Sequence, residues 1–121
     1  GVRDAAAALA ILAGHGLILA AVRALRRETA FDADGQSREL VTGGVFGRLR
    51  HPIAAGLVYL YLGCVLAAPN ALGLAGLMAF GGHLRRQIGR EERLLEARFG
   101  EPFRAYRRAV GAVWPRRRTP G

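Results

Sequence analysis

The chain has 121 residues, enough for one domain or part of one. Its 18 basic residues, all of them Arg, outnumber 9 acidic residues, and 51% of the chain is hydrophobic. This composition is too apolar for a disordered basic tail, and a single Cys excludes both an internal disulfide framework and a multi-Cys zinc site. The arginines therefore serve either nucleic-acid binding or the cytoplasmic face of a membrane protein, and their distribution separates the two.

The first apolar segment, residues 5–22, carries no formal charge and is rich in Ala, Leu and Ile. As a helix it would extend for about 27 Å, close to the thickness of a hydrocarbon core. A signal peptide would need a basic start and a cleavage site of small residues. Here Arg3 is balanced by Asp4, and the segment ends in a cluster of arginines, so we predict a membrane span.

The polar loop 27–50 contains a glycine-rich run at 42–47. These glycines do not form the dinucleotide fingerprint, since no predicted strand precedes them and no acidic residue follows at the required distance. The run is either a plain loop or a backbone that approaches a ligand closely. His51 comes directly before Pro52, a residue suited to the first turn of a helix. At that helix N-terminus His51 is either an interfacial side chain without a partner or a binder of a polar ligand group.

The second apolar segment, residues 52–84, has no formal charge and is too long for one span. The dipeptide Pro69-Asn70 within it is a turn signal. We predict a helical hairpin with arms at 53–67 and 71–84 and a turn at 68–70. Small residues let membrane helices approach one another, so we expect four glycines to serve the contact between the arms: Gly56, Gly63, Gly73 and Gly76.

The tail begins with a strongly helical run at 84–99. Its apolar residues form one stripe, and Glu91 and Glu92 lie on the two edges of that stripe. Carboxylates at the margin of a buried face need partners. These partners are either arginines of the chain or hydroxyl and ammonium groups of a bound cofactor. Gly100 is expected to end this helix and Pro102 to start another, in which Phe103 and Tyr106 pack on the hairpin.

The arginines lie almost entirely on one side of this arrangement. Six fall in the segment 23–51, eleven in 85–121, and only Arg3 lies elsewhere. One crossing followed by a hairpin places both segments on the same side, which the positive-inside rule makes cytoplasmic. The sequence thus predicts an all-α fold, a multi-pass membrane helix bundle with cytoplasmic C-terminal helices, and no binding of nucleic acid.

Two motifs and their spacing resemble a known family. The stretch LVTGGVFGRLRHP at 40–52, an apolar hairpin and REERLLEARFGEPFRAY at 90–106 are similar to the integral-membrane methyltransferases. These are the isoprenylcysteine carboxyl methyltransferases and the phospholipid N-methyltransferases. The resemblance implies one membrane methyltransferase-like domain over residues 1–121, to which further upstream helices belong.

The resemblance also implies S-adenosylmethionine as methyl donor, bound on the cytoplasmic side. The cofactor-contacting positions that it implies are Leu40, Val41, Phe46, His51, Pro52, Glu91 and Glu92. It implies a substrate-side arginine shortly before the acidic pair. Arg86 is the nearest arginine, although the exact spacing falls on Gln87. The sequence departs from the family pattern at Phe46, Ala54 and Phe103, where tyrosine is usual.

Methyl transfer from a sulfonium needs alignment and exclusion of water more than an acid or a base. This agrees with a sequence that has no evident catalytic triad and for which we predict neither a catalytic side chain nor a metal. We therefore expect an enzyme that methylates a lipidic or lipid-anchored acceptor, carboxylate or amine, among membrane lipids. The alternative is a catalytically silent membrane scaffold or partner-binding protein with the same fold.

Overall fold

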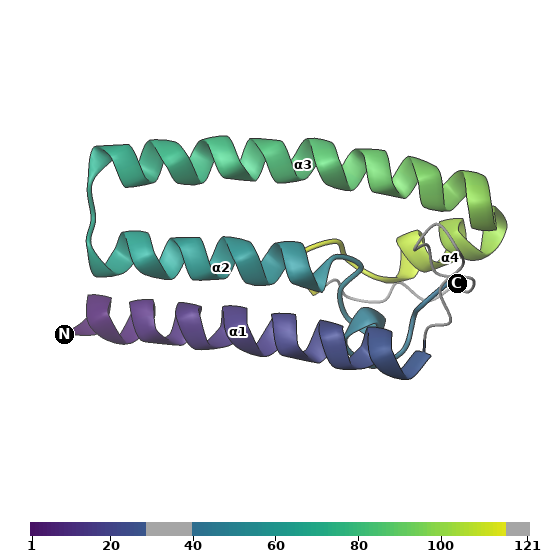
Figure 1. Ribbon diagram of the computed structural model, residues 1–121, viewed down its shortest axis with the longest axis horizontal. Coiled ribbons are helices and arrows are strands. Elements are labelled where there is room, and N and C mark those ends of the chain that lie inside the picture. Colours follow the sequence, from purple (N-terminus) through teal and green to yellow (C-terminus); the bar gives the residue numbers. More distant parts are fainter. Residues whose placement is uncertain (29–39, 116–121) are drawn as a thin grey trace.

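The computed structural model describes residues 1–28 and 40–115, and the regular elements of this part are helices. They are α1 (Val2–Glu28), the short 3-10 helix η1 (Gly44–Gly47), α2 (Pro52–Ala67), α3 (Ala71–Phe99) and α4 (Glu101–Ala109). Figure 1 shows α1, α2 and α3 running lengthwise side by side, with α4 at the far end of α3. The all-α prediction is thus confirmed for the described residues.

One helix is long and apolar enough to cross a membrane. It is α1, over Val2–Arg27, and it extends beyond the predicted span 5–22 at both ends. The helix α2 is apolar but shorter. By this measure the described residues hold one candidate span, so the multi-pass arrangement remains a prediction.

The hairpin turn lies where the sequence predicts it. Pro52 occupies the first turn of α2, and Asn70 caps α3 by accepting a hydrogen bond of 2.6 Å from the backbone N–H of Gly73. A difference appears further along, because the second arm and the tail helix are one continuous helix of 29 residues. No Pro interrupts the chain between 71 and 99, and the N–H groups of an unbroken helix need no other partners.

The closest approach between helices is that of α1 to α2. A Cβ atom on Gly14 would lie 2.6 Å from the Gly56 carbonyl oxygen, and one on Gly63 would lie 2.9 Å from the Ala7 carbonyl oxygen. The expectation that Gly56 and Gly63 serve the contact between α2 and α3 is therefore wrong, since they face α1. Gly76 does serve it, because a Cβ there would overlap the Tyr61 hydroxyl of α2.

The C-terminal part folds back onto the start of α2. Gly100, with φ of +65°, allows the chain to turn between α3 and α4. After α4 the backbone N–H groups of Arg50 and His51 donate to the carbonyls of Gly111 and Ala112, at 2.8 and 2.9 Å. Two backbone hydrogen bonds to the tail therefore hold Arg50 and His51, the residues just before α2, in place.

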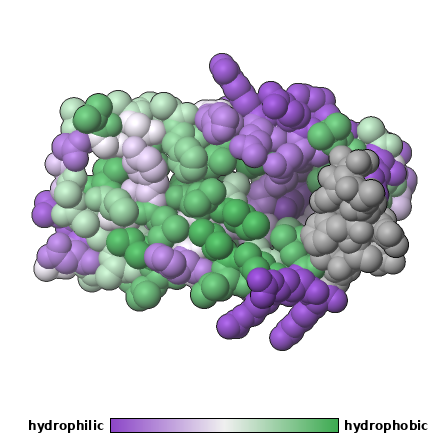
Figure 2. All heavy atoms as spheres, viewed as in Figure 1, coloured by the Kyte–Doolittle hydropathy of each residue, from purple (hydrophilic) through white to green (hydrophobic). Residues whose placement is uncertain are grey.

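Charge and hydropathy divide the molecule along its length. The N-terminus and the α2–α3 turn lie at one end, whereas α4 and the C-terminal end of α1 lie at the other (Figure 1). In Figure 2 hydrophobic residues cover much of the body, and hydrophilic residues gather over the second half of α3 along the upper edge. The arginine-rich parts of the described chain thus share one end of the bundle.

Candidate functional site

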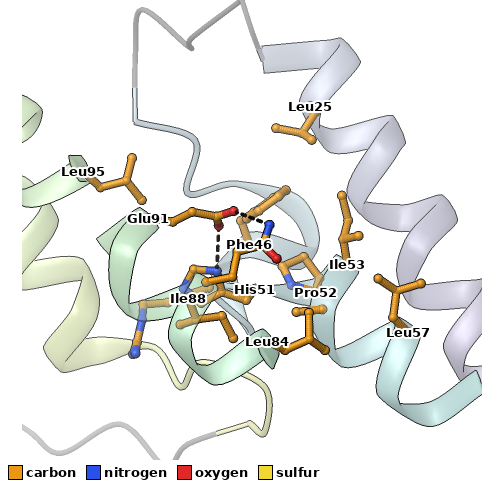
Figure 3. Close-up of a pocket in the computed structure, with 13 residues that line it drawn as sticks. Leu25, Phe46, His51, Pro52, Ile53, Leu57, Leu84, Ile88, Glu91 and Leu95 are labelled. Atoms are coloured by element: carbon orange, nitrogen blue, oxygen red, sulfur yellow. Dashed lines mark hydrogen bonds and ion pairs between the residues drawn. The ribbon is translucent and has the colours of Figure 1, made fainter. Parts of the chain in front are cut away.

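A cavity of about 360 Å³ opens where α1, η1, α2 and α3 meet (Figure 3). Apolar side chains from three helices form most of its wall: Leu25, Ile53, Leu57, Leu84, Ile88 and Leu95. Polar groups also line it, from the start of α2 and from α3: Arg50, His51, Gln87 and Glu91. Phe46, Pro52 and Ala54 complete the lining. The cavity therefore combines an apolar surface with a small number of convergent polar groups, which is the composition of a ligand site.

His51 stands at the entrance to α2, and its side chain is only 8% exposed. Its Nδ1 lies 3.9 Å from Glu91 Oε2, and its Nε2 lies 3.3 Å from Glu92 Oε2. Neither contact has hydrogen-bond geometry, and within the described residues the buried Nε2 has no hydrogen-bond partner. Buried polar atoms usually have partners, so Nε2 depends on the neighbouring Glu92, whereas Nδ1 is the ring nitrogen nearer to the cavity-lining Glu91.

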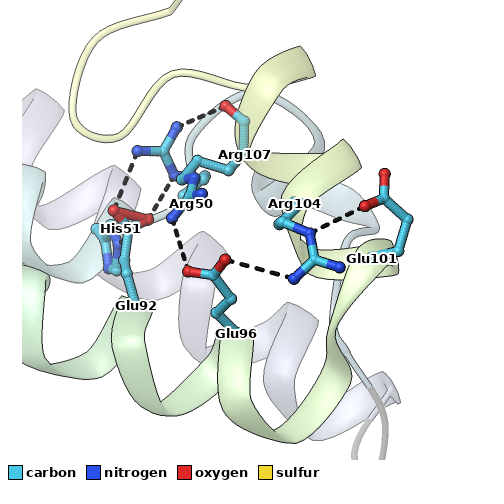
Figure 4. Close-up of polar contacts among 7 residues, drawn as sticks. All are labelled: Arg50, His51, Glu92, Glu96, Glu101, Arg104 and Arg107. Carbon is cyan, nitrogen blue, oxygen red and sulfur yellow. Dashed lines mark hydrogen bonds and ion pairs between the residues drawn. The ribbon is translucent and has the colours of Figure 1, made fainter.

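Glu92 is held by Arg50 (Figure 4). The guanidinium donates from Nε to Oε2 at 2.8 Å and from Nη2 to Oε1 at 3.3 Å, a bidentate pair in which both side chains are largely buried. Burial raises the pKa of the Glu92 carboxyl, but hydrogen bonding and the charge of Arg50 outweigh it, with a smaller contribution from His51. The net result is a lowered pKa, so Glu92 is a carboxylate at neutral pH.

Glu91 is the acid that lines the cavity. Its side chain is 51% exposed, and its Oε1 accepts a hydrogen bond of 3.4 Å from Gln87 Nε2, one turn earlier on α3. Figure 3 shows Glu91 turned toward His51, across the cavity from the start of α2. The two neighbouring acids thus differ, because the oxygens of Glu92 are engaged by Arg50 whereas Glu91 retains capacity for a ligand.

Phe46 reaches the cavity from η1, and Tyr106 of α4 fixes its backbone. The Tyr106 hydroxyl donates a hydrogen bond of 2.6 Å to the Phe46 carbonyl. Burial raises the pKa of Tyr106 to about 12, an effect that Glu92 supports and Arg50 opposes. The phenol therefore stays protonated and able to donate. The Tyr106 hydroxyl thus holds the segment before α2, a role that the sequence analysis did not predict.

The structure places the predicted site residues unequally. Four line the cavity, Phe46, His51, Pro52 and Glu91, and Glu92 lies directly behind His51. Leu40 and Val41 are partly buried but do not line it. Arg86 is exposed and borders a different hollow on α3, whereas the neighbouring Gln87 faces the cavity.

Sequence reasoning missed Arg50 as part of the site. The signal available was its position directly before His51, since residues adjacent in sequence at the start of a helix lie in the same part of the structure. The ion pair itself joins residues 42 positions apart and could not be inferred from local pattern.

Comparison with curated proteins and with solved structures gave no match. The family profile described as phospholipid methyltransferase matches residues 2–102, a range that includes every residue lining the cavity. The protein therefore belongs to the phospholipid methyltransferase family.

Proposed function

We propose that the protein transfers a methyl group from S-adenosylmethionine to a lipidic or lipid-anchored acceptor at the cytoplasmic face of the membrane. The observation that carries the proposal is the cavity, in which His51, Glu91 and Phe46 adjoin walls formed by Ile53 and Leu57. A polar cofactor and a lipid acceptor need such neighbouring surfaces. Membership in a methyltransferase family that is named for phospholipids supports a lipid acceptor.

The residues fit the cofactor by their chemistry. When bound, S-adenosylmethionine supplies a methyl group activated by a sulfonium. The half-exposed Glu91 carboxylate can accept hydrogen bonds from hydroxyl or ammonium groups, and His51 Nδ1, which lies 3.9 Å from Glu91 Oε2, can hydrogen-bond a polar group placed beside Glu91. Phe46 offers an aromatic face for a heterocycle. In this assignment Glu92 supports His51 from behind, held by Arg50, and does not itself contact the ligand.

The acceptor is assigned to the apolar wall. Leu84 and Ile88 of α3 face the same cavity as Ile53 and Leu57 of α2, so an acyl or prenyl chain can lie along them. These side chains exclude water from the polar groups, which strengthens electrostatic contacts there. Gln87 provides an amide between this wall and Glu91. We assign Gln87, in place of Arg86, to the substrate side of the cavity.

The membrane placement is part of the proposal. We infer that α1 crosses the bilayer, and that α2 and residues 71–84 of α3 cross and return. The apolar composition of these segments and the grouping of arginines at one end of the bundle support this arrangement. In a Cys64→Ser background, cysteines at positions 37 and 119, which lie outside the described residues, should resist labelling from outside intact cells. Efficient labelling there would overturn the orientation.

Two measurements test the activity. Purified protein in neutral detergent should bind S-adenosylmethionine in calorimetry, and His51→Ala should weaken binding about tenfold or more, as expected for losing one polar partner in a sheltered site. Membranes containing the protein should then transfer a labelled methyl group to an extractable lipid or lipid-anchored product. Absence of cofactor binding by a correctly folded wild-type protein would instead favour the silent-scaffold alternative.

A further inference from the structure

A second, strongly basic surface lies on α3, outside the cavity. Four exposed arginines and two glycines border one open hollow on this helix: Gly82, Arg85, Arg86, Gly89, Arg90 and Arg93. We call this set the outer arginine face. At about 100° per residue, it lies on the opposite side of α3 from the cavity-lining residues Leu84, Ile88 and Glu91. It is therefore a separate surface from the proposed methyl-transfer site.

The carboxylates of α3 contact other segments of the chain and not the arginines of this face. Glu92 pairs with Arg50, and Glu96 pairs with Arg104 and Arg107 of α4 (Figure 4). Glu91 lies beside His51 at the cavity. Within the part of the chain that the structure describes, the four arginines of the outer face make no ion pair or hydrogen bond. The face therefore carries four positive charges that no acidic side chain in this part compensates.

Such a stripe favours a bound anion. Arg86 and Arg90 are four residues apart and Arg90 and Arg93 are three apart, spacings at which like charges on a helix destabilise each other. A phosphate between them would relieve this repulsion, and guanidinium groups bind phosphate oxygens in pairs. The glycines leave room, because a Cβ on Gly82 would have no heavy atom within 4 Å and one on Gly89 only the flexible end of Arg93.

The position along α3 indicates where that phosphate comes from. The face begins at the end of the apolar stretch 71–84, at the level where α3 leaves the hydrophobic surface seen in Figure 2. In the membrane placement proposed above, this is the boundary between acyl chains and headgroups. An anionic leaflet attracts Arg side chains at this depth. The inference uses that placement but does not depend on the methyl-transfer activity.

We propose that the outer arginine face binds the phosphate of an anionic phospholipid headgroup, at a site distinct from that of the methyl acceptor. The lipid would hold the second half of α3 at the membrane surface. Its acyl chains would lie along the exposed side chains of Leu74 and Met78 on the apolar half of the same helix.

The test is a lipid titration of the full chain in neutral detergent, followed by native mass spectrometry. Phosphatidylglycerol should bind more tightly than phosphatidylcholine. The variant Arg90→Gln/Arg93→Gln should bind phosphatidylglycerol roughly tenfold to thirtyfold more weakly, the effect of losing two arginines near an anionic headgroup. Circular dichroism checks that this variant keeps the helical content of the wild type.

The matched control is Arg23→Gln/Arg26→Gln, which removes two exposed arginines with the same spacing from the end of α1. It should retain phosphatidylglycerol binding. An equal loss in both variants would mean that only net charge matters and would overturn the site. Displacement of the lipid by millimolar inorganic phosphate would assign the face to free phosphate, and would overturn the lipid assignment. Cofactor binding, measured separately, reports on the methyltransferase proposal alone.

Discussion

Arg50 and Glu92 form a two-point ion pair that connects the start of α2 to the middle of α3, with N–O distances of 2.8 and 3.3 Å. The same guanidinium donates through Nη1 to the backbone carbonyls of Arg107, at 3.1 Å, and Val110. One side chain therefore joins three segments that are distant in sequence. Because His51 follows Arg50 directly, this junction also sets where the imidazole stands relative to the cavity.

Replacing Arg50 should destabilise the protein more than replacing any exposed arginine. In Arg50→Gln the largely buried Glu92 carboxylate loses its partner, which costs about 3 kcal/mol of unfolding free energy. Arg50→Lys should lie between this variant and the wild type, since lysine keeps the charge but cannot form the two-point contact. Unfolding by titration with a denaturing detergent, followed by circular dichroism, measures these differences.

Two variants serve as controls for that measurement. Arg104→Gln removes an arginine that is 40% exposed and paired with Glu96 and Glu101, so it should cost no more than about 1 kcal/mol. The double variant Arg50→Gln/Glu92→Gln should recover part of the lost stability, because no unpaired buried charge remains. Similar losses for the substitutions at positions 50 and 104 would show that the buried pair has no special weight.

The stability of the protein should fall in acid partly through Glu92. Its pKa in the folded state is lowered from 4.5, so its contribution is complete above that pH and is lost as the pH falls through the folded-state pKa. Glu92→Gln should therefore show a shallower decline in unfolding free energy below about pH 4.5. Glu101, whose pKa is also lowered by hydrogen bonds from Arg108 and Arg104, is exposed and contributes less because water screens the pair. A larger change in slope for Glu101→Gln than for Glu92→Gln would contradict the assignment.

The elements that the sequence predicted correctly have local causes. The turn before α3 follows from Pro69-Asn70, and the junction of α3 with α4 follows from Gly100 and Pro102. In both places the conformation depends on the residues at that point and not on partners elsewhere. The positions of His51 and Glu91 beside one cavity agree with the motif spacing, because a hairpin returns the chain to the level at which it left.

Three features could not be predicted from the sequence. Two of them depend on partners far away in the chain, and the third depends on a shift of one position along α3. Glycines indicate that two helices approach closely but do not indicate which helix is the partner. The sequence therefore suggested that Gly56 contacts α3, whereas it packs against Gly14 of α1. Arg86 and Gln87 differ by one position, which rotates a side chain by about 100° and places only Gln87 at the cavity. Arg50 joins the start of α2 to the tail by donating a hydrogen bond to the Val110 carbonyl, and Val110 is sixty residues away in the sequence.

Tyr106→Phe should loosen the wall of the cavity without unfolding the protein. The variant removes the hydroxyl that donates to the Phe46 carbonyl, a loss of about 1 kcal/mol, and should weaken S-adenosylmethionine binding about fivefold. Tyr59→Phe, which removes a more exposed hydroxyl bonded to the Val113 carbonyl at 3.2 Å, should leave cofactor affinity unchanged. In wild type the phenolate absorption of Tyr106 should appear only near pH 12 and be absent from the variant.

The contact between α1 and α2 should tolerate no side chain at Gly14. In Gly14→Ala the new methyl group would lie 2.6 Å from the Gly56 carbonyl oxygen, so the helices must separate, at about 1–3 kcal/mol of unfolding free energy. Gly16→Ala is the control on the same helix, since a Cβ there meets nothing within 4 Å. It should be neutral or stabilise the helix by about 0.5–1 kcal/mol. Detergent unfolding of both variants decides whether this crossing is as tight as the distances indicate.

The two adjacent acids of α3 should separate into a ligand-binding residue and a structural one. Glu91 lines the cavity, is half-exposed and accepts only a 3.4 Å hydrogen bond from Gln87, so Glu91→Gln should leave unfolding unchanged. It should weaken S-adenosylmethionine binding about tenfold to a hundredfold, the effect of removing one charged partner from a sheltered site. Glu92→Gln should do the reverse, because it leaves the Arg50 guanidinium without its carboxylate and lowers the unfolding free energy. Calorimetry and detergent unfolding on the same preparations give the cofactor affinity and the unfolding free energy of each variant. If Glu92→Gln loses cofactor affinity at unchanged stability while Glu91→Gln binds like wild type, the roles of the two acids are exchanged and the ligand lies on the other side of His51.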